Sequence, residues 1–393
     1  MSEPVTVRPT RRDARRVAVG VCDRDLHRYV IVGGVVNNAT AATFADPHAK
    51  GPRPGRGGPA VTFGDAALAG DPVLEATVRG IVERVEVLLR ESVEAADPVL
   101  NESARHLVEA GGKRFRPLLT ALVAQLGGTS TSEEVVLAGA VVELTHLATL
   151  YHDDVMDEAP VRRGAPSANA RWGNAVAILT GDYLFARAAN LAARLGPEAV
   201  RIQADTFARL VQGQIAETVG PRGVDPVEHY LRVIADKTGS LIGTCARFGG
   251  MFGGLDPSTV EVASAYGETV GIAFQLSDDL LDISSPATES GKTPGTDLRE
   301  GVPTLPVLYA LADDATDPNS LRLREILALG PLTDDDLVAE ALELLRESSG
   351  LKRARETVRG YAERARNHLA ELPDGSARRA LESLADVIAD RTA

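Results

Sequence analysis

The chain is poor in the residues that build disulfide frameworks and zinc sites. Only two cysteines, Cys22 and Cys245, occur among its 393 residues, and neither lies in a spacing typical of metal ligands. The composition therefore excludes a small disulfide-stapled domain, and it fits a protein of a reducing cytoplasm.

Long apolar runs and an excess of positive charge are missing as well. No apolar run approaches the roughly 20 residues of a membrane-spanning helix, and the apolar residues 17–21 after the basic beginning of the chain are too few for an export signal. The formal net charge of −13 argues against a nucleic acid as the main partner, because phosphate backbones bind basic surfaces. We therefore expect a soluble cytoplasmic protein with no transmembrane segment and no nucleic-acid partner.

Charge and composition divide the chain near residue 60. Residues 1–60 contain ten Lys or Arg and five Asp or Glu, a net charge of +5, whereas the remainder contains 32 and 50, a net charge of −18. Proline and glycine dominate residues 52–59 without apolar periodicity. We predict that residues 1–60 form a mostly disordered extension and that residues 61–393 form the folded domain.

The pattern from about Asp71 onward is helical. Ile81, Val82, Val85 and Leu89, for example, recur at the spacing of one face of a helix. Similar stripes continue toward the C-terminus, separated by clusters of Gly and Pro, and candidate strands are lacking. We therefore predict an all-α fold, a large single-domain bundle of ten or more helices.

Two copies of one acidic pattern, DDxxD, lie in apolar stretches with helical periodicity. The copies consist of Asp153, Asp154 and Asp157, and of Asp278, Asp279 and Asp282. On a helix, the outer aspartates of each copy lie one turn and roughly 6 Å apart, so their like charges repel. Paired carboxylates without a nearby His or Cys favour a hard divalent ion such as Mg²⁺. The two copies therefore predict a site for more than one metal ion.

Basic residues accompany these motifs. Lys113, Arg114 and Arg116 lie in the segment GGKRFRP, residues 111–117. Cations at a helix N-terminus oppose the helix dipole unless they share an anion, so the segment indicates a phosphate or diphosphate site, with a solvated basic loop as the alternative. Further basic residues flank the acidic motifs, each of which alone is also explained as surface charge: Arg162, Arg163, Lys237 and Lys292. Together they supply enough positive charge to hold two diphosphates.

Five segments resemble, in order and spacing, the motif regions of the trans-isoprenyl diphosphate synthases, also called polyprenyl synthetases: GGKRFRP, HLATLYHDDVMDEAPVRRG, KTG, FQLSDDLLD and GKTPGTDLREG. The resemblance covers roughly residues 75–393 and implies a helical bundle around a central cavity. It also implies a homodimeric transferase that condenses isopentenyl diphosphate with an allylic prenyl diphosphate. One position departs from the family pattern, because Val302 follows Gly301 where many members have lysine.

The resemblance assigns roles to individual residues. It implies three Mg²⁺ ions, bound by the aspartates of the two motifs, which hold the allylic diphosphate. The residues that match the family's isopentenyl diphosphate site are Lys113, Arg116, His146 and Arg163. Those that match its contacts to the allylic diphosphate are Arg162, Lys237 and Lys292. Thr238 and Gln275 match residues that face the reacting carbons. Together with Lys237, which matches a contact to the leaving diphosphate, they form the predicted catalytic set.

Small residues precede the first acidic motif, and the resemblance connects them to product length. Thr149, Ala148 and Thr145 lie four, five and eight residues before Asp153, and none is aromatic. Short-chain members of the family typically have a large aromatic residue at the fourth or fifth place, whereas Ala148 and Thr149 resemble long-chain members. Tyr151 lies about 160° around the helix from Asp153 and should not block the path. These residues favour a long product, with close helix packing as the other explanation of their small size.

Other functions fit parts of the pattern. A ferritin-like metal bundle would use Glu143 and His146, but the sequence has no second Glu-x-x-His. A class I terpene cyclase also ionises a prenyl diphosphate, yet it would usually replace the second acidic motif and has no second substrate for the GGKRFRP segment. A silent regulatory subunit would be expected to lose acidic residues, and none is lost. A geranylgeranyl diphosphate synthase would differ in product length alone.

We therefore predict a long-chain all-trans polyprenyl diphosphate synthase that adds isopentenyl diphosphate repeatedly to farnesyl or geranylgeranyl diphosphate. Breaking the allylic C–O bond leaves a carbocation and a diphosphate anion, and metals and fixed cations stabilise that anion. The product would serve as a quinone side chain, such as that of menaquinone, and would pass to membrane enzymes.

Overall fold

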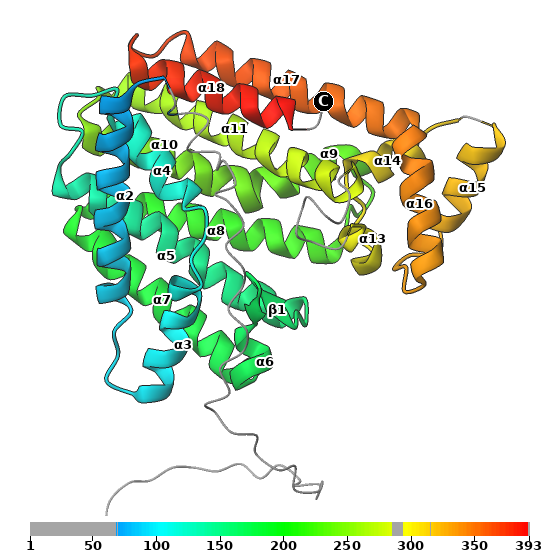
Figure 1. The fold of residues 1–393 in the computed structure, drawn as a ribbon, viewed down its shortest axis with the longest axis horizontal. Helices are drawn as coiled ribbons and strands as arrows, with labels where there is room; N and C mark the ends of the chain where they lie inside the picture. Colours follow the sequence, from blue (N-terminus) through cyan, green and yellow to red (C-terminus); the bar gives the residue numbers. More distant parts are fainter. Residues whose placement is uncertain (1–67, 69, 285–293, 315, 392–393) are drawn as a thin grey trace, which may run out of the picture. The chain divides into compact units, whose positions relative to one another are not determined.

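The computed structural model describes residues 68, 70–284, 294–314 and 316–391, which fold almost entirely as helices (Figure 1). This confirms the all-α class and the ten or more helices predicted from the sequence. The extension 1–60 and Lys292 lie outside the described residues. The elements are α2 (Pro72–Ser92), α3 (Pro98–Glu109), α4 (Phe115–Ala124), α5 (Glu133–Met156), β1 (Val161–Arg162), β2 (Ala165–Pro166), α6 (Ala168–Trp172), α7 (Asn174–Arg194), α8 (Pro197–Val219), α9 (Pro226–Ile234), the π-helix η1 (Ala235–Gly239), α10 (Ser240–Gly253), α11 (Pro257–Ser284), α13 (Thr296–Glu300), α14 (Leu305–Leu311), α15 (Pro318–Leu327), α16 (Asp335–Glu347), α17 (Ser349–Leu369) and α18 (Ser376–Asp390).

A short β-hairpin follows the first acidic motif, although the sequence pattern predicts no strand. β1 and β2 pair antiparallel. The turn residues Arg163 and Gly164 have φ angles of 54° and 76°, the left-handed geometry of the tight turns that match the twist of two paired strands. The hairpin reverses the chain, so that Arg162 returns to the acidic motif and Arg163 reaches the end of α3.

The central helix of the fold is α5. It packs against α2, α4, α7 and α10, and most of its side chains are buried. In the described part of the chain it is the one helix long and apolar enough to span a membrane, with a mean hydropathy of 1.4. The expectation that no apolar segment approaches this length is therefore wrong for α5. Because 78% of its apolar window is buried inside the fold, its hydropathy is that of a core helix.

α11 joins two parts of the hydrophobic core. Tyr266 and Val270 belong to a cluster shared with helices α2–α10, whereas Leu276 and Leu280 pack with α9, α13 and the helices that follow. α17 and α18 run along α11 (Figure 1), and the Tyr266 hydroxyl donates to the carbonyl of Leu381 in α18 at 2.8 Å. This packing brings the end of α18 back to the second acidic motif.

Both acidic motifs lie at the C-terminal ends of long helices, α5 and α11. α5 begins normally, with Ser132 as its capping residue and with Glu133 and Glu134 in its first turn, where the helix dipole favours acidic side chains. The opposite end of a helix carries partial negative charge, which disfavours carboxylates there. The position of the motifs therefore adds to the repulsion among their aspartates and increases the need for cations.

Candidate active site

The aspartates of the first motif differ in exposure. Asp157 is exposed, Asp153 is half-buried and Asp154 is fully buried. Arg162 Nε donates to Asp154 Oδ1 at 2.6 Å, while Asp154 Oδ2 is buried and has no hydrogen-bond partner among the described residues. Burial raises the pKa of Asp153 to about 6, although nearby Lys237 opposes this shift. Among the described residues, the motif therefore has less positive charge close to it than its three carboxylates carry negative charge.

Asp279 is the buried carboxylate of the second motif. It accepts hydrogen bonds from the Tyr230 hydroxyl of α9 and from Gln275 Nε2, the latter at 2.9 Å. Burial nevertheless raises the pKa of Asp279 to about 6, because its two hydrogen bonds only partly offset the loss of water. The position of this carboxylate is fixed from two helices.

The other two aspartates of the second motif contact the end of the chain and the segment after α11. Asp278 forms an ion pair with Arg391, the residue that follows α18. Asp282 Oδ2 accepts the backbone N–H of Asp297 at 3.1 Å. Each acidic residue of this motif is thus positioned by a different element.

The π-helix η1 links the two motifs. Thr238 Oγ1 donates to Gln275 Oε1 at 3.0 Å, and Gln275 in turn bonds the buried aspartate of the second motif. Lys237 lines a cavity together with Asp153 of the first motif, and it forms an ion pair with Glu217 of α8. π-helical turns contain an extra residue and are frequent at functional sites. The structure thus brings together Lys237, Thr238 and Gln275, the three residues of the predicted catalytic set.

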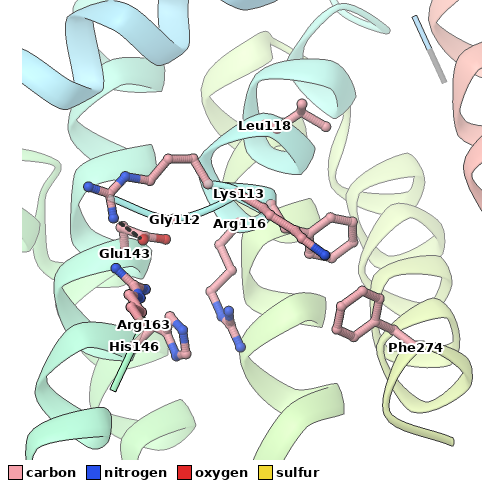
Figure 2. Close-up of a pocket in the computed structure, with 10 residues that line it drawn as sticks. Gly112, Lys113, Arg116, Leu118, Glu143, His146, Arg163 and Phe274 are labelled. Atoms are coloured by element: carbon pink, nitrogen blue, oxygen red, sulfur yellow. Dashed lines mark hydrogen bonds and ion pairs between the residues drawn. The ribbon is translucent and has the colours of Figure 1, made fainter. Parts of the chain in front are cut away.

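One cavity of about 290 Å³ contains the four residues that match the isopentenyl diphosphate site: Lys113, Arg116, His146 and Arg163. They come from the loop before α4, from α4 and α5, and from the turn of the hairpin. Figure 2 shows the Arg116 side chain between His146 on one side and Phe274 on the other. Phe274 stacks on Phe115, with ring centroids 5.1 Å apart and an angle of 13° between the planes. The cavity therefore has a basic wall and an aromatic wall.

The electrostatics of this cavity suit an anion. Within the part of the chain that the structure describes, Arg116 Nε is buried without a hydrogen-bond partner. Burial lowers the pKa of the Arg116 guanidinium, which still stays charged. Burial and the neighbouring guanidinium groups of Arg116 and Arg163 hold the pKa of His146 well below its usual range, so the imidazole is neutral near pH 7. An anion with several oxygens would accept hydrogen bonds from these groups and balance their charge.

Gly112 allows Arg163 to reach the cavity. A Cβ atom at position 112 would lie 3.1 Å from the guanidinium carbon of Arg163, and the φ angle of +149° there is one that other residues rarely adopt. Arg163 is fixed by hydrogen bonds to the carbonyl oxygens of Leu107, at 3.0 Å, and of Gly111. Both glycines of GGKRFRP thus contact Arg163: Gly112 leaves room for its guanidinium group, and the Gly111 carbonyl accepts a hydrogen bond from it.

Arg114, the remaining cation of GGKRFRP, has a structural role. It is 7% exposed and forms ion pairs with Glu86 of α2 and with Glu143 of α5, the latter at 2.9 Å. It also donates to the carbonyl of Val108 at 2.9 Å. Its charge is therefore balanced within the protein, and it ties α2, α3 and α5 to the start of α4.

A second, smaller cavity of about 110 Å³ lies beside the first acidic motif. Thr149 and Asp153 of α5 line it together with Phe185 of α7 and Phe207 of α8. The two phenyl rings lie 4.1 Å apart, measured between centroids. The cavity thus leads from a motif carboxylate to an apolar wall, as a site for a hydrocarbon chain requires.

Only one of the three residues assigned to product length borders this cavity in the described structure, namely Thr149. Ala148 lies five residues before Asp153, which places it about 140° around the helix from that aspartate. Its side chain is fully buried, and its carbonyl oxygen lies close to Gly181 of α7. Thr145 is buried as well, and its hydroxyl donates to the Val141 carbonyl at 2.8 Å. The Tyr151 hydroxyl donates to a carbonyl of α3, away from the cavity, as its position in the sequence predicts.

The donor set of the acidic motifs fits a hard divalent metal. All of the candidate ligand atoms are carboxylate oxygens, and one of them, Asp154 Oδ2, is a buried acceptor to which no described residue donates. Among the described residues, no three His, Cys, Asp or Glu side chains converge closely enough to enclose an ion by themselves. Ions at this site would therefore take their remaining ligands from water and from a diphosphate, as Mg²⁺ commonly does.

Sequence reasoning missed three residues of the site. Glu217 pairs with Lys237 beside the first motif, Tyr230 bonds Asp279, and Arg391 pairs with Asp278. None of the three lies in a sequence motif that indicates a function, and each is brought to the site by the packing of helices. Val302 lies just after α13, where its N–H donates to the carbonyl of Asp297 at 2.9 Å, and it supplies no charge.

An all-α bundle that places two aspartate motifs beside a cationic cavity defines a diphosphate-binding protein of the isoprenoid synthase fold. The profile of the polyprenyl synthetase family matches residues 97–345. A nonaprenyl diphosphate synthase of Mycobacterium tuberculosis is 57% identical over 323 residues, which cover 82% of this chain and 96% of that protein. The chain belongs to the polyprenyl synthetase family.

Solved structures resemble this chain over most of its length. A geranylgeranyl pyrophosphate synthase from Corynebacterium glutamicum, complexed with calcium and isoprenyl diphosphate, is 47% identical with a TM-score of 0.74, covering 82% of this chain and 98% of that one. A decaprenyl diphosphate synthase from Rhodobacter capsulatus is 36% identical with a TM-score of 0.73, covering 82% and 99%. The predicted family and the predicted isoprenoid synthase type of bundle are therefore confirmed.

Proposed function

We propose that the protein is a long-chain all-trans polyprenyl diphosphate synthase that adds isopentenyl diphosphate repeatedly to an allylic primer such as farnesyl or geranylgeranyl diphosphate. The observation that carries the proposal is the presence of two separate groups of residues, each suited to a diphosphate. One is the cationic cavity with Arg116 and His146, and the other lies between the acidic motifs on either side of η1. Two substrates that each carry a diphosphate need two such sites, whereas a cyclase with one substrate needs one.

The residues of the chain divide the work between these sites. Lys113, Arg116 and Arg163 bind the diphosphate of isopentenyl diphosphate, and neutral His146 donates a hydrogen bond to it. The six aspartates would hold Mg²⁺, for which we propose three ions, and bound Mg²⁺ would stabilise the negative charge of the leaving diphosphate. Arg162 and Lys237 add positive charge at that end, and the family resemblance assigns the same role to Lys292, which lies outside the described residues.

The reacting carbons lie between the two sites. Thr238 and Gln275 form one hydrogen-bonded unit, so their oxygens face the allylic cation in a fixed orientation. The double bond of isopentenyl diphosphate attacks this cation, one carbon–carbon bond forms, and the released diphosphate accepts the proton that leaves. The apolar walls keep water from the cation, which would otherwise form an alcohol.

The expected length of the product is supported mainly by the relatives of this chain. The nonaprenyl and decaprenyl diphosphate synthases named above favour a long product, and Thr149 leaves the entrance of the apolar cavity open. A geranylgeranyl diphosphate synthase is the second candidate, because Phe185 and Phe207 narrow the cavity to about 110 Å³. The product of the long-chain enzyme would be a quinone side chain, such as that of menaquinone, handed to membrane enzymes.

We further propose a homodimer in the cytoplasm. Leu179 of α7 and Ile215 of α8 are 64% and 57% exposed, and these neighbouring helices offer an apolar face that a second copy would cover. Two relatives are named as component 2 of heptaprenyl diphosphate synthases, so a different partner chain is the alternative occupant of this face. We also propose that residues 1–60 are not needed for catalysis, so deleting them should leave activity unchanged.

The direct experiment is a condensation assay. Purified protein, Mg²⁺, labelled isopentenyl diphosphate and geranylgeranyl diphosphate should give labelled prenyl diphosphates, and a chelator should stop their formation. The Asp153→Ala variant should be inactive with an unchanged circular dichroism spectrum. Near-normal turnover by this variant would contradict the metal assignment.

A further inference from the structure

The end of α18 brings a cation to the second acidic motif. Arg391 forms an ion pair with Asp278 through its guanidinium group, and 18% of the Arg391 side chain and 38% of the Asp278 side chain are exposed. The Arg391 guanidinium also lies 5.4 Å from the ring centroid of Phe274, which is one helical turn before Asp278 on α11. Asp278 and Phe274, one helical turn apart on α11, thus both contact the guanidinium group of Arg391.

The position of Arg391 is fixed by the packing of its helix. α18 packs against α4, α11 and α17, and the hydrogen bond from the Tyr266 hydroxyl to the Leu381 carbonyl ties it to α11. The backbone N–H of Arg391 continues the helix by donating to the Val387 carbonyl at 3.2 Å. A cation is also favoured there by the negative end of the helix dipole.

Arg391 and a divalent ion need the same carboxylate. Arg391 donates to Oδ1 of Asp278. Mg²⁺ lies about 2.0–2.1 Å from its oxygen ligands, so an ion at Asp278 would place a double positive charge within contact distance of the guanidinium. The two cations repel at that distance, so a bound ion weakens the contact between Arg391 and Asp278, and the guanidinium in turn opposes the ion.

We infer that Arg391 is a positioning residue that acts as an internal counter-ion of Asp278, displaced when a divalent metal binds the second acidic motif. The inference rests on the proposed function, because it takes Asp278 as a metal ligand. Arg391 compensates part of the charge of the three aspartates on α11, and it sets the concentration of metal at which Asp278 becomes available. Metal occupancy is thereby coupled to the end of α18.

The experiment uses Mn²⁺ as the probe, because Mn²⁺ shares the preference of Mg²⁺ for carboxylate ligands and its free form is counted by electron paramagnetic resonance. Full-length wild-type protein and Arg391→Gln are titrated with Mn²⁺ in the absence of prenyl substrates. A partly exposed ion pair and a single cation–π contact are each weak, so Arg391→Gln should bind Mn²⁺ only about three- to tenfold more tightly. A residue with a merely structural role would leave the affinity unchanged or weaken it.

Three control variants isolate the contact. Arg378→Gln removes another arginine of α18, one that pairs with Glu382 at 3.0 Å, and should leave Mn²⁺ binding at the wild-type affinity. In an Asp278→Asn background, Arg391→Gln should no longer tighten binding, since the shared carboxylate is gone. Arg391→Lys retains the charge and should stay closer to wild type than Arg391→Gln.

An Mn²⁺ affinity in Arg391→Gln that equals or falls below that of the wild type would overturn the inference, as would tightening that persists in the Asp278→Asn background. Failure of the proposed function has a different signature, namely a wild-type protein that forms no prenyl product. An active enzyme in which Arg391→Gln leaves Mn²⁺ affinity unchanged would refute the role of Arg391 alone.

Discussion

Replacing Thr149 with phenylalanine tests where the growing hydrocarbon chain runs. Thr149 borders the cavity of about 110 Å³ beside Asp153, opposite Phe185 and Phe207. Phenylalanine has four more non-hydrogen atoms than threonine and would place an aromatic ring at the edge of this small cavity. One ring therefore fills the space that the next isoprene unit needs, and the main product of Thr149→Phe should stop at geranylgeranyl diphosphate or shorter.

The assay is mass spectrometry of the prenyl diphosphates made from farnesyl diphosphate and isopentenyl diphosphate. Thr149→Val is the matched control, because it keeps the size of the side chain and should give the wild-type product. Ala148→Phe provides the contrast: the sequence pattern predicts that it shortens the product, whereas the buried position of Ala148 predicts overpacking and a loss of about 1–3 kcal/mol of stability. Wild-type product length in Thr149→Phe would refute the path along this cavity.

Three further predictions follow from single contacts. The folded-state pKa of His146 lies well below the value of 6.5 that applies to an unfolded chain. Below pH 6.5 the unfolded state therefore binds a proton that the folded state does not bind, and the free energy of unfolding falls as the pH falls. Below pH 6.5, the free energy of unfolding of His146→Gln should therefore fall less steeply than that of the wild type, by up to about 1.4 kcal/mol per pH unit. Urea unfolding at a series of pH values below 6.5 measures this difference. Gly112→Ala pushes on the Arg163 guanidinium and should raise the KM for isopentenyl diphosphate by roughly tenfold or more, while the KM for the allylic primer changes little. Tyr230→Phe leaves the buried Asp279 carboxylate without one hydrogen bond and should cost about 1–3 kcal/mol of stability, whereas a loss below the error of urea unfolding would show that the bond is dispensable.

The helical class and the cluster of diphosphate-binding residues were predictable because they depend on local patterns. Apolar periodicity marks helices, and the repulsion within each DDxxD copy marks a place where cations must bind. The four residues that match the isopentenyl diphosphate site do line one cavity, although they come from three separate segments. Their order along the chain therefore carried enough information to group them.

The remaining parts of the site depend on packing that no local pattern contains. Arg391 meets Asp278 only because α18 runs back along α11, and Glu217 meets Lys237 only because η1 packs against α8. The helical rotation of Ala148 is set by residue spacing, but its burial against α7 appears only in the fold. The hairpin was also hidden, since each of its strands has two residues and too few to show alternation.

The most direct test of the central claim is the mass of the product that the wild-type protein makes from Mg²⁺, isopentenyl diphosphate and geranylgeranyl diphosphate. Two diphosphate sites and an apolar cavity predict a linear prenyl diphosphate longer than the primer, with a mass that increases by whole isoprene units. A product that has lost its diphosphate without gaining an isoprene unit, or the recovery of both substrates unchanged, would contradict the account.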